Sequence, residues 1–308
     1  MNKYRKSSLL LLLSTLVGGW HSPVAGQQAE TKDPPQQAAA VSQPETAEVD
    51  RFLRVRRNRD GQPVSMETSI TRYVGKNADG QRITVDLIGV VHIGEQEYYE
   101  KLNEHFTRYD SLLYELVAPE GTRVPRGGRG GGGANPVAFL QNSMKSMLGL
   151  DFQLDHIDYM ADNFVHADMS PDEFLESMEE NDESFFKMAM KAIGQGMAMQ
   201  NRNPEMSDTG LMLAMLSGDE NKLRRLMASQ MQDIESGMLI FEGRDGSTII
   251  HHRNRKAFEV MRDEIANGQR HIGVFYGAGH LPDMDQRLLK EHGMKRGGQF
   301  WLEAWDLR

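Results

Sequence analysis

Two histidines and one glutamate follow or end hydrophobic stretches of the kind that form buried strands. His92 closes the tetrapeptide GVVH and His280 closes GAGH, so the same Gly-x-x-His pattern follows two such stretches. Glu115 lies near the end of a third, within LLYELV. Ligands of open α/β sheets bind at the carboxyl ends of the strands, so we expect these three side chains to meet there.

Two imidazoles and one carboxylate are a suitable ligand set for a divalent metal with open coordination positions. A water molecule in an open position becomes more acidic and can attack an acyl bond. A structural interpretation stands beside this one. Each histidine can fill a purely structural role, and Glu115 can accept backbone hydrogen bonds or pair with an arginine, because a carboxylate on an apolar strand needs a partner.

The elements that position these residues predict an α/β fold with α+β character and a central mixed sheet. Residues 52–56 and 64–74 form an N-terminal β-hairpin around an Asn-Arg-Asp-Gly turn signal. Residues 83–91 are a nearly continuous β-branched run, typical of a strand buried on both faces. A helix over 95–109 and a strand over 111–117 complete a βαβ unit, whose strands we expect to be parallel.

Residues 136–240 are predicted to form a large helical insert that carries most of the 20 methionines. Ser170, Pro171 and Glu173 form a strong helix start. The methionines form either a core of packed helices or an adaptable apolar wall over a binding cleft. The chain then returns to α/β order, with predicted helices over 253–267 and 283–292 and strands over 271–276 and 300–307.

Over residues 82–308 the chain resembles the TraB/GumN family. The resemblance rests on GVVH, on Glu115 in LLYELVAPEG, on Arg253 followed by Asn254, and on YGAGHL. That family is related to the Tiki proteases and belongs to a clan with erythromycin esterase-like and haem-binding ChaN-like members. The resemblance implies an α/β fold with both histidine motifs at one site. For the Tiki branch it implies metal-dependent proteolysis, with manganese or cobalt as the ion.

The resemblance also implies roles for single residues. His92 and His280 become metal ligands or catalytic bases, and Glu115 a third ligand or the general base. Arg253 neutralises Glu115 or stabilises an oxyanion; its structural alternative is a surface ion pair. The first functional prediction is therefore a hydrolase of a peptide or small acyl substrate. The alternatives are a metal-independent, esterase-like hydrolase that uses His and Glu, and a non-catalytic envelope protein that binds haem, metal or peptide.

The remaining polar residues near these motifs are not predicted to join the site. His166 and Asp168 precede the helix start at Ser170, and we expect Asp168 to serve that helix start rather than the site. His251 and His252 are adjacent in a basic stretch, and we expect both to face solvent.

The N-terminus predicts export to the periplasm or the medium. Residues 1–26 show the basic, apolar and small-residue order of a signal peptide, and the apolar run is too short for a comfortable membrane span. A retained anchor is the alternative. Residues 27–48 form a disordered Gln/Pro/Ala-rich linker, and 49–308 the domain. The absence of cysteine excludes disulfides and thiol chemistry, and the net charge of −9 argues against nucleic acid as a partner.

Overall fold

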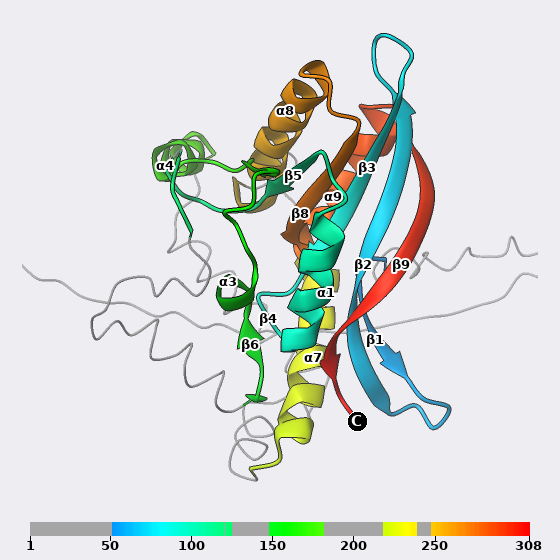
Figure 1. Cartoon of the computed structure of the whole chain (residues 1–308). Helices are drawn as coiled ribbons and strands as arrows, with labels where there is room; N and C mark the ends of the chain where they lie inside the picture. Colours follow the sequence, from blue (N-terminus) through cyan, green and yellow to red (C-terminus); the bar gives the residue numbers. More distant parts are fainter. Residues whose placement is uncertain (1–50, 120, 125–147, 182–217, 239–247) are drawn as a thin grey trace, which may run out of the picture. The chain divides into compact units, whose positions relative to one another are not determined.

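Seven strands of the described part of the chain form one mixed sheet in the computed structural model (Figure 1). The structure describes residues 51–119, 121–124, 148–181, 218–238 and 248–308, so the predicted signal peptide and linker lie outside it. The strands of this sheet are β1 (Leu53–Arg57), β2 (Pro63–Lys76), β3 (Arg82–Val90), β5 (Ser111–Tyr114), β7 (Phe164–His166), β8 (His271–Gly277) and β9 (Lys295–Asp306).

The predicted N-terminal hairpin is confirmed, since β1 and β2 pair in antiparallel fashion. The turn between them is closed by Asn58, whose Oδ1 accepts hydrogen bonds from the backbone N–H groups of Asp60 and Gln62. Gly61 follows with φ 80°, a conformation that glycine adopts without strain. Strand β2 is long because it pairs with β1 along its first half, with β3 along its second half, and with β9 along its other edge.

The parallel half of the sheet follows the order β3-β8-β5-β7. Strands β3 and β5 are joined by α1 (Gln96–Phe106), so the predicted parallel βαβ unit is confirmed. Strand β8 enters from the far end of the chain and lies between them. The carboxyl ends of these four strands therefore lie side by side.

Helices cover both faces of the parallel strands, as expected for strands that read as continuous apolar runs. Phe275 of β8 faces α1, where its ring centroid lies 4.7 Å from that of Phe106. The next residue, Tyr276, points to the opposite face and packs with α8 (Arg253–Ala266) and α9 (Leu281–Lys290). The alternation of side chains along β8 thus divides the buried core into two layers.

Residues 136–147, 182–217 and 239–240 of the predicted helical insert, 136–240, lie outside the described residues, and the described part differs in one respect from the prediction. Strand β7 falls inside it and extends the main sheet by pairing with β5. At three residues β7 is too short to show a period of its own, and its pairing with β5 defines it. The helix start at Ser170 is confirmed as a capping box with Glu173. The other described elements of this stretch are β6 (Asp151–Phe152), α3 (Gln153–His156), α4 (Pro171–Glu180) and α7 (Glu220–Met238).

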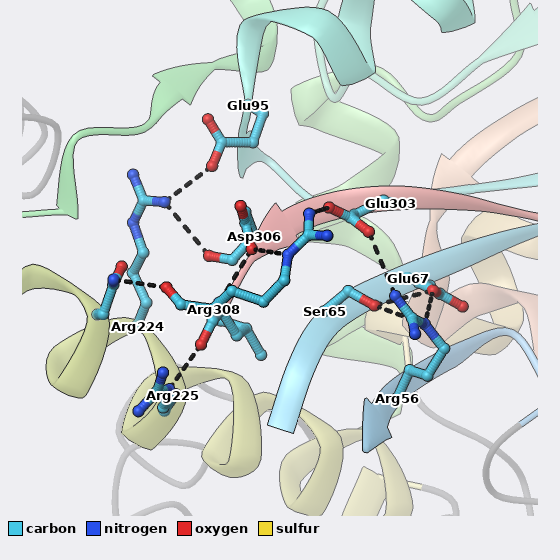
Figure 2. A network of polar contacts seen from close by, with 11 residues as sticks. Arg56, Ser65, Glu67, Glu95, Arg224, Arg225, Glu303, Asp306 and Arg308 are labelled. Carbon is cyan, nitrogen blue, oxygen red and sulfur yellow. Dashed lines mark hydrogen bonds and ion pairs between the residues drawn. The ribbon is translucent and has the colours of Figure 1, made fainter. Parts of the chain in front are cut away.

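Polar contacts attach α7 to the C-terminal end of β9 (Figure 2). Arg224 donates to the carbonyl of Asp306 over 3.3 Å, and Arg225 donates to the carbonyl of Leu307 over 2.6 Å. Arg224 also donates to Glu95, just before α1, over 2.8 Å. A second group of contacts around Glu67 joins β1, β2 and β9 in the same view. Within the described ranges, no helix is both long and apolar enough to cross a membrane.

Candidate functional site

The four parallel strands each lead to a polar residue at their carboxyl ends. His92 follows β3, Glu115 follows β5, Asp168 follows β7, and β8 leads through a short 3-10 turn to His280. Arg253 begins α8 beside them. These five residues are called the Glu115 cluster below. Four of the five, all but Asp168, are residues that the sequence predicted for the site, and the sheet topology explains why the strand-end residues meet.

Arg253 joins two carboxylates from neighbouring strands. Its Nη2 lies 2.7 Å from Oε1 of Glu115, and its Nε and Nη2 bind both oxygens of Asp168 at 2.9 and 2.6 Å. Arg253 is only 9% exposed, so its alternative as a surface ion pair is wrong. The expected helix-start role of Asp168 is also wrong, because Ser170 caps α4 while Asp168 is buried as the counter-charge of Arg253.

Gly277 is the point on which the other side chains converge. Its N–H donates to Oε2 of Glu115 over 2.7 Å. A Cβ at this position would lie 3.2 Å from Oε2 of Glu115, 3.9 Å from Nε2 of His92 and 3.9 Å from Cδ2 of His280. Glycine therefore leaves room for two imidazoles and a carboxylate to approach one another. Glu115 has both partners of its structural alternative, a backbone N–H and an arginine.

The electrostatics keep Glu115 ionised. Burial opposes its charge, but the charge and hydrogen bond of His280, then Arg253 and His92, hold the pKa of the Glu115 carboxyl well below its usual range. Burial also opposes the charge of Arg253, yet its bond to Asp168 and the charge of Glu115 raise the pKa of that guanidinium. Two carboxylates against one guanidinium leave a net negative charge facing the histidines, which favours a cation or a proton there.

Asn254 determines which ring nitrogen of His280 carries a hydrogen and which is available to a ligand. Its Nδ2 donates to the carbonyl of His280 over 3.0 Å and to Asp283 over 2.8 Å, so its Oδ1 must be an acceptor. Nδ1 of His280, 2.6 Å away, therefore carries a hydrogen and donates it. Nε2 of His280 faces Oε1 of Glu115 at 3.5 Å. A lone pair on that nitrogen would face a carboxylate oxygen, so a proton or a metal ion between them is favoured.

His92 is exposed and is held by residues that the sequence did not indicate. Its Nδ1 lies 2.9 Å from Oε1 of Gln153, and Nε2 of Gln153 donates to Oη of Tyr159 over 2.6 Å. The backbone N–H of Gln153 also donates to the carbonyl of His92. Pairing of β4 (Ile93–Gly94) with β6 places Gln153 there. No local sequence signal predicts a contact across 61 residues.

The other candidate histidines contact residues outside this cluster. His251 lies 3.5 Å from Asp283, and Nδ1 of His252 lies 2.7 Å from Oγ of Ser177. Both are half-buried, so the expectation that they face solvent is wrong. His166 contacts the carbonyl of Leu116 over 2.6 Å, and it was not predicted to join the site.

The donors of the cluster fit a divalent metal in their chemistry. Nε2 of His92, Nε2 of His280 and the carboxylate of Glu115 are nitrogen and oxygen donors of the kind that bind such ions. The second nitrogen of each imidazole contacts an amide oxygen, the outer-shell pattern that orients metal-binding histidines. In the arrangement shown, no group of three His, Asp or Glu residues within the described segments could hold a metal ion. Binding would therefore require these side chains to move from the arrangement shown.

Comparisons with known proteins add no relative to this geometry: no family model matches the chain, and neither a curated protein nor a solved structure is significantly similar to it. The TraB/GumN resemblance therefore remains a prediction that rests on the motifs.

Proposed function

We propose that the chain is a hydrolase of the TraB/GumN type that cleaves a peptide or other acyl bond at the Glu115 cluster. One observation carries this proposal. Two imidazoles and an ionised carboxylate converge on Gly277 at the carboxyl ends of adjacent parallel strands. The predicted signal peptide supports export, so we propose a periplasmic or secreted location for this activity.

In the first form of this proposal, His92, His280 and Glu115 hold a divalent metal, with manganese or cobalt suggested by the resemblance. When bound, such an ion acidifies a water molecule and polarises the acyl oxygen. The chain's own residues prepare the site. Asn254 fixes a hydrogen on Nδ1 of His280, which leaves Nε2 as the ligand atom. Arg253 keeps Glu115 ionised and oriented.

A second form needs no metal, and the contact between His280 and Glu115 favours it. In this form His280 takes the proton of the attacking water through Nε2. Glu115 lies 3.5 Å from the same nitrogen and stabilises the imidazolium that forms, while Oδ1 of Asn254 accepts the hydrogen of Nδ1 and orients the ring. Arg253 then limits the negative charge that Glu115 and Asp168 present together. Both forms depend on His280, Glu115 and Arg253, and the metal form also uses His92.

The test is hydrolysis by the full-length chain of a fluorogenic peptide library and a p-nitrophenyl ester series, with manganese, with cobalt and with chelator. The proposal predicts activity that is lost in His280→Ala and Glu115→Gln. His271→Ala is the matched control, because His271 lies at the start of β8 and contacts Asp86 instead. Sensitivity to chelator supports the metal form, and resistance supports the metal-free form. Activity that survives in both site variants would contradict the proposal.

A further inference from the structure

The hydroxyl of Tyr159 can donate a hydrogen bond, but it donates to none of the described residues. Its Oη accepts a hydrogen bond from Nε2 of Gln153 at 2.6 Å. Among the residues that the structure describes, no atom accepts the hydroxyl's own hydrogen. Tyr159 is only 6% exposed, and a buried tyrosine hydroxyl usually donates to a partner. A bound ligand is the kind of partner that would complete its hydrogen bonding.

The surroundings of Tyr159 direct this hydroxyl toward the Glu115 cluster. Gln153 bridges Tyr159 and His92, so the two side chains lie one amide apart. The ring of Tyr159 packs against Tyr114, the residue before Glu115, with centroids 5.3 Å apart. Burial raises the pKa of the Tyr159 hydroxyl, and the charge of Glu115 raises it further. The phenol therefore keeps its proton at neutral pH and acts as a hydrogen-bond donor.

Arg253 is less available than Tyr159 to donate a hydrogen bond to a ligand. The resemblance gave it two roles, to neutralise Glu115 or to stabilise an oxyanion. Its Nε and Nη2 already bind Asp168 and Glu115, so the geometry favours the first role. A neutral hydroxyl beside an anionic cluster is better suited to receive a ligand oxygen, because it is not bound to a carboxylate.

We propose that Tyr159 donates a hydrogen bond to the acyl oxygen of a substrate held beside His92, and that Gln153 positions both side chains. The catalytic role of this hydrogen bond rests on the proposed hydrolase function. Water adds to the acyl carbon, and the carbonyl electron pair moves onto the oxygen, which Tyr159 stabilises. When the carbonyl forms again, the bond to the leaving amine or alcohol breaks and the leaving group takes a proton from the attacking water. Tyr159 keeps its own proton throughout.

The test uses methylphosphonate, a tetrahedral oxyanion, as the probe. Its binding to the full-length chain is measured by titration calorimetry with and without added manganese. We expect Tyr159→Phe to weaken binding about tenfold or more, as for the loss of one hydrogen bond to a charged group. Tyr109→Phe is the matched control, because Tyr109 is also buried but donates to Asp86. Wild-type binding no tighter than that of Tyr159→Phe would overturn the proposal.

Gln153→Leu gives an independent variant and a readout without activity. We expect it to weaken phosphonate binding and to change the ¹⁵N shifts of the His92 ring, because both contacts of Gln153 are lost. Unchanged shifts and unchanged binding would overturn its positioning role. If Tyr159→Phe weakens phosphonate binding while no form hydrolyses any substrate, the donor role holds and the hydrolase proposal fails. If a substrate is hydrolysed equally by wild type and Tyr159→Phe, the donor role fails and the hydrolase proposal holds.

Discussion

Asp285 and Glu115 both have arginine partners, yet these two carboxylates differ in what surrounds them. Asp285 of α9 is 1% exposed and accepts hydrogen bonds from Arg51, Tyr73 and Arg296. These four residues are called the Asp285 cluster. Its donors are guanidinium groups and a phenol, which hold their protons at neutral pH. Burial and the neighbouring Asp285 raise the pKa of Tyr73 further.

The Glu115 cluster has a different set of partners. Beside one guanidinium and one backbone N–H, it includes the imidazoles of two histidines. His92 is exposed, and its Nε2 faces the same point as Glu115. An ion cluster whose donors all remain protonated at neutral pH is suited to stabilising the fold. A cluster that includes histidine nitrogens and an exposed member is suited to binding and proton transfer.

The largest expected effect separates the two clusters by activity. Glu115→Gln should lower the hydrolytic kcat/KM by about 1,000-fold, because the carboxylate that binds the metal or supports His280 is lost. Asp285→Asn should leave kcat/KM of the folded protein nearly unchanged. Rates are measured on both variants at a temperature where each remains folded. A large loss in Asp285→Asn together with a small loss in Glu115→Gln would reverse the assignment of the two clusters.

The second effect concerns stability. Asp285→Ala should lower the free energy of unfolding by about 2–3 kcal/mol, because two guanidinium groups and a phenol lose their acceptor. The value lies below that of a fully buried pair because the Arg296 side chain is 38% exposed. Urea unfolding followed by circular dichroism measures it. A loss below about 0.5 kcal/mol, the size of an ordinary surface substitution, would contradict a structural role for this cluster.

A third effect tests the convergence on Gly277. In Gly277→Ala the added Cβ would meet Oε2 of Glu115 at 3.2 Å, so the carboxylate must shift by a few tenths of an ångström. We expect kcat/KM to fall about tenfold, since small displacements of reacting groups slow catalysis. Gly298→Ala is the control, because nothing lies within 4 Å of its added Cβ. Equal rates in the two variants would show that the Gly277 region does not position the site.

The smallest expected effect is on the pH dependence of the free energy of unfolding. It comes from Glu67, whose contacts are shown in Figure 2. Burial opposes its charge, but hydrogen bonds from Arg56, Arg54 and Ser65 lower the pKa of Glu67 below 4.5. Its contribution is therefore present above pH 4.5 and is lost as pH falls through the lower, folded value. The arginines are 46% and 37% exposed, so this contribution stays below about 1 kcal/mol.

Urea unfolding of wild type and Glu67→Gln at a series of pH values checks this sign. The stability difference between the two proteins should shrink as the pH is lowered from neutral to about 3, below the unperturbed glutamate pKa. A difference that grows on acidification would contradict the lowered pKa.

The sequence predicted the parts of the fold that have local signals. The hairpin turn, the β-branched run of β3 and the capping box at Ser170 each depend on neighbouring residues, and all three are confirmed. Strand β7 could not be predicted because three residues carry no period of their own. Its pairing with β5 is what brings Asp168 beside Arg253.

The candidate site was predicted in part for the same physical reason. His92 and His280 stand in a repeated local motif, which the sequence shows directly. The contacts of Arg253 with Asp168 and Glu115 join residues 85 and 138 positions apart. Gln153 meets His92 across 61 positions. Residues so far apart in the sequence come into contact only when the sheet and the β4–β6 pair have formed.

The most direct test of the central claim is the metal content of the full-length chain, measured by elemental mass spectrometry after purification without metal-affinity resin. Wild type, His92→Ala, His280→Ala and the control His271→Ala are compared, before and after incubation with manganese or cobalt. The account predicts about one equivalent of metal in wild type and in His271→Ala, and loss of that metal in the two site variants. A wild-type chain that takes up neither ion, or site variants that keep the metal, would contradict a shared metal site of His92, Glu115 and His280.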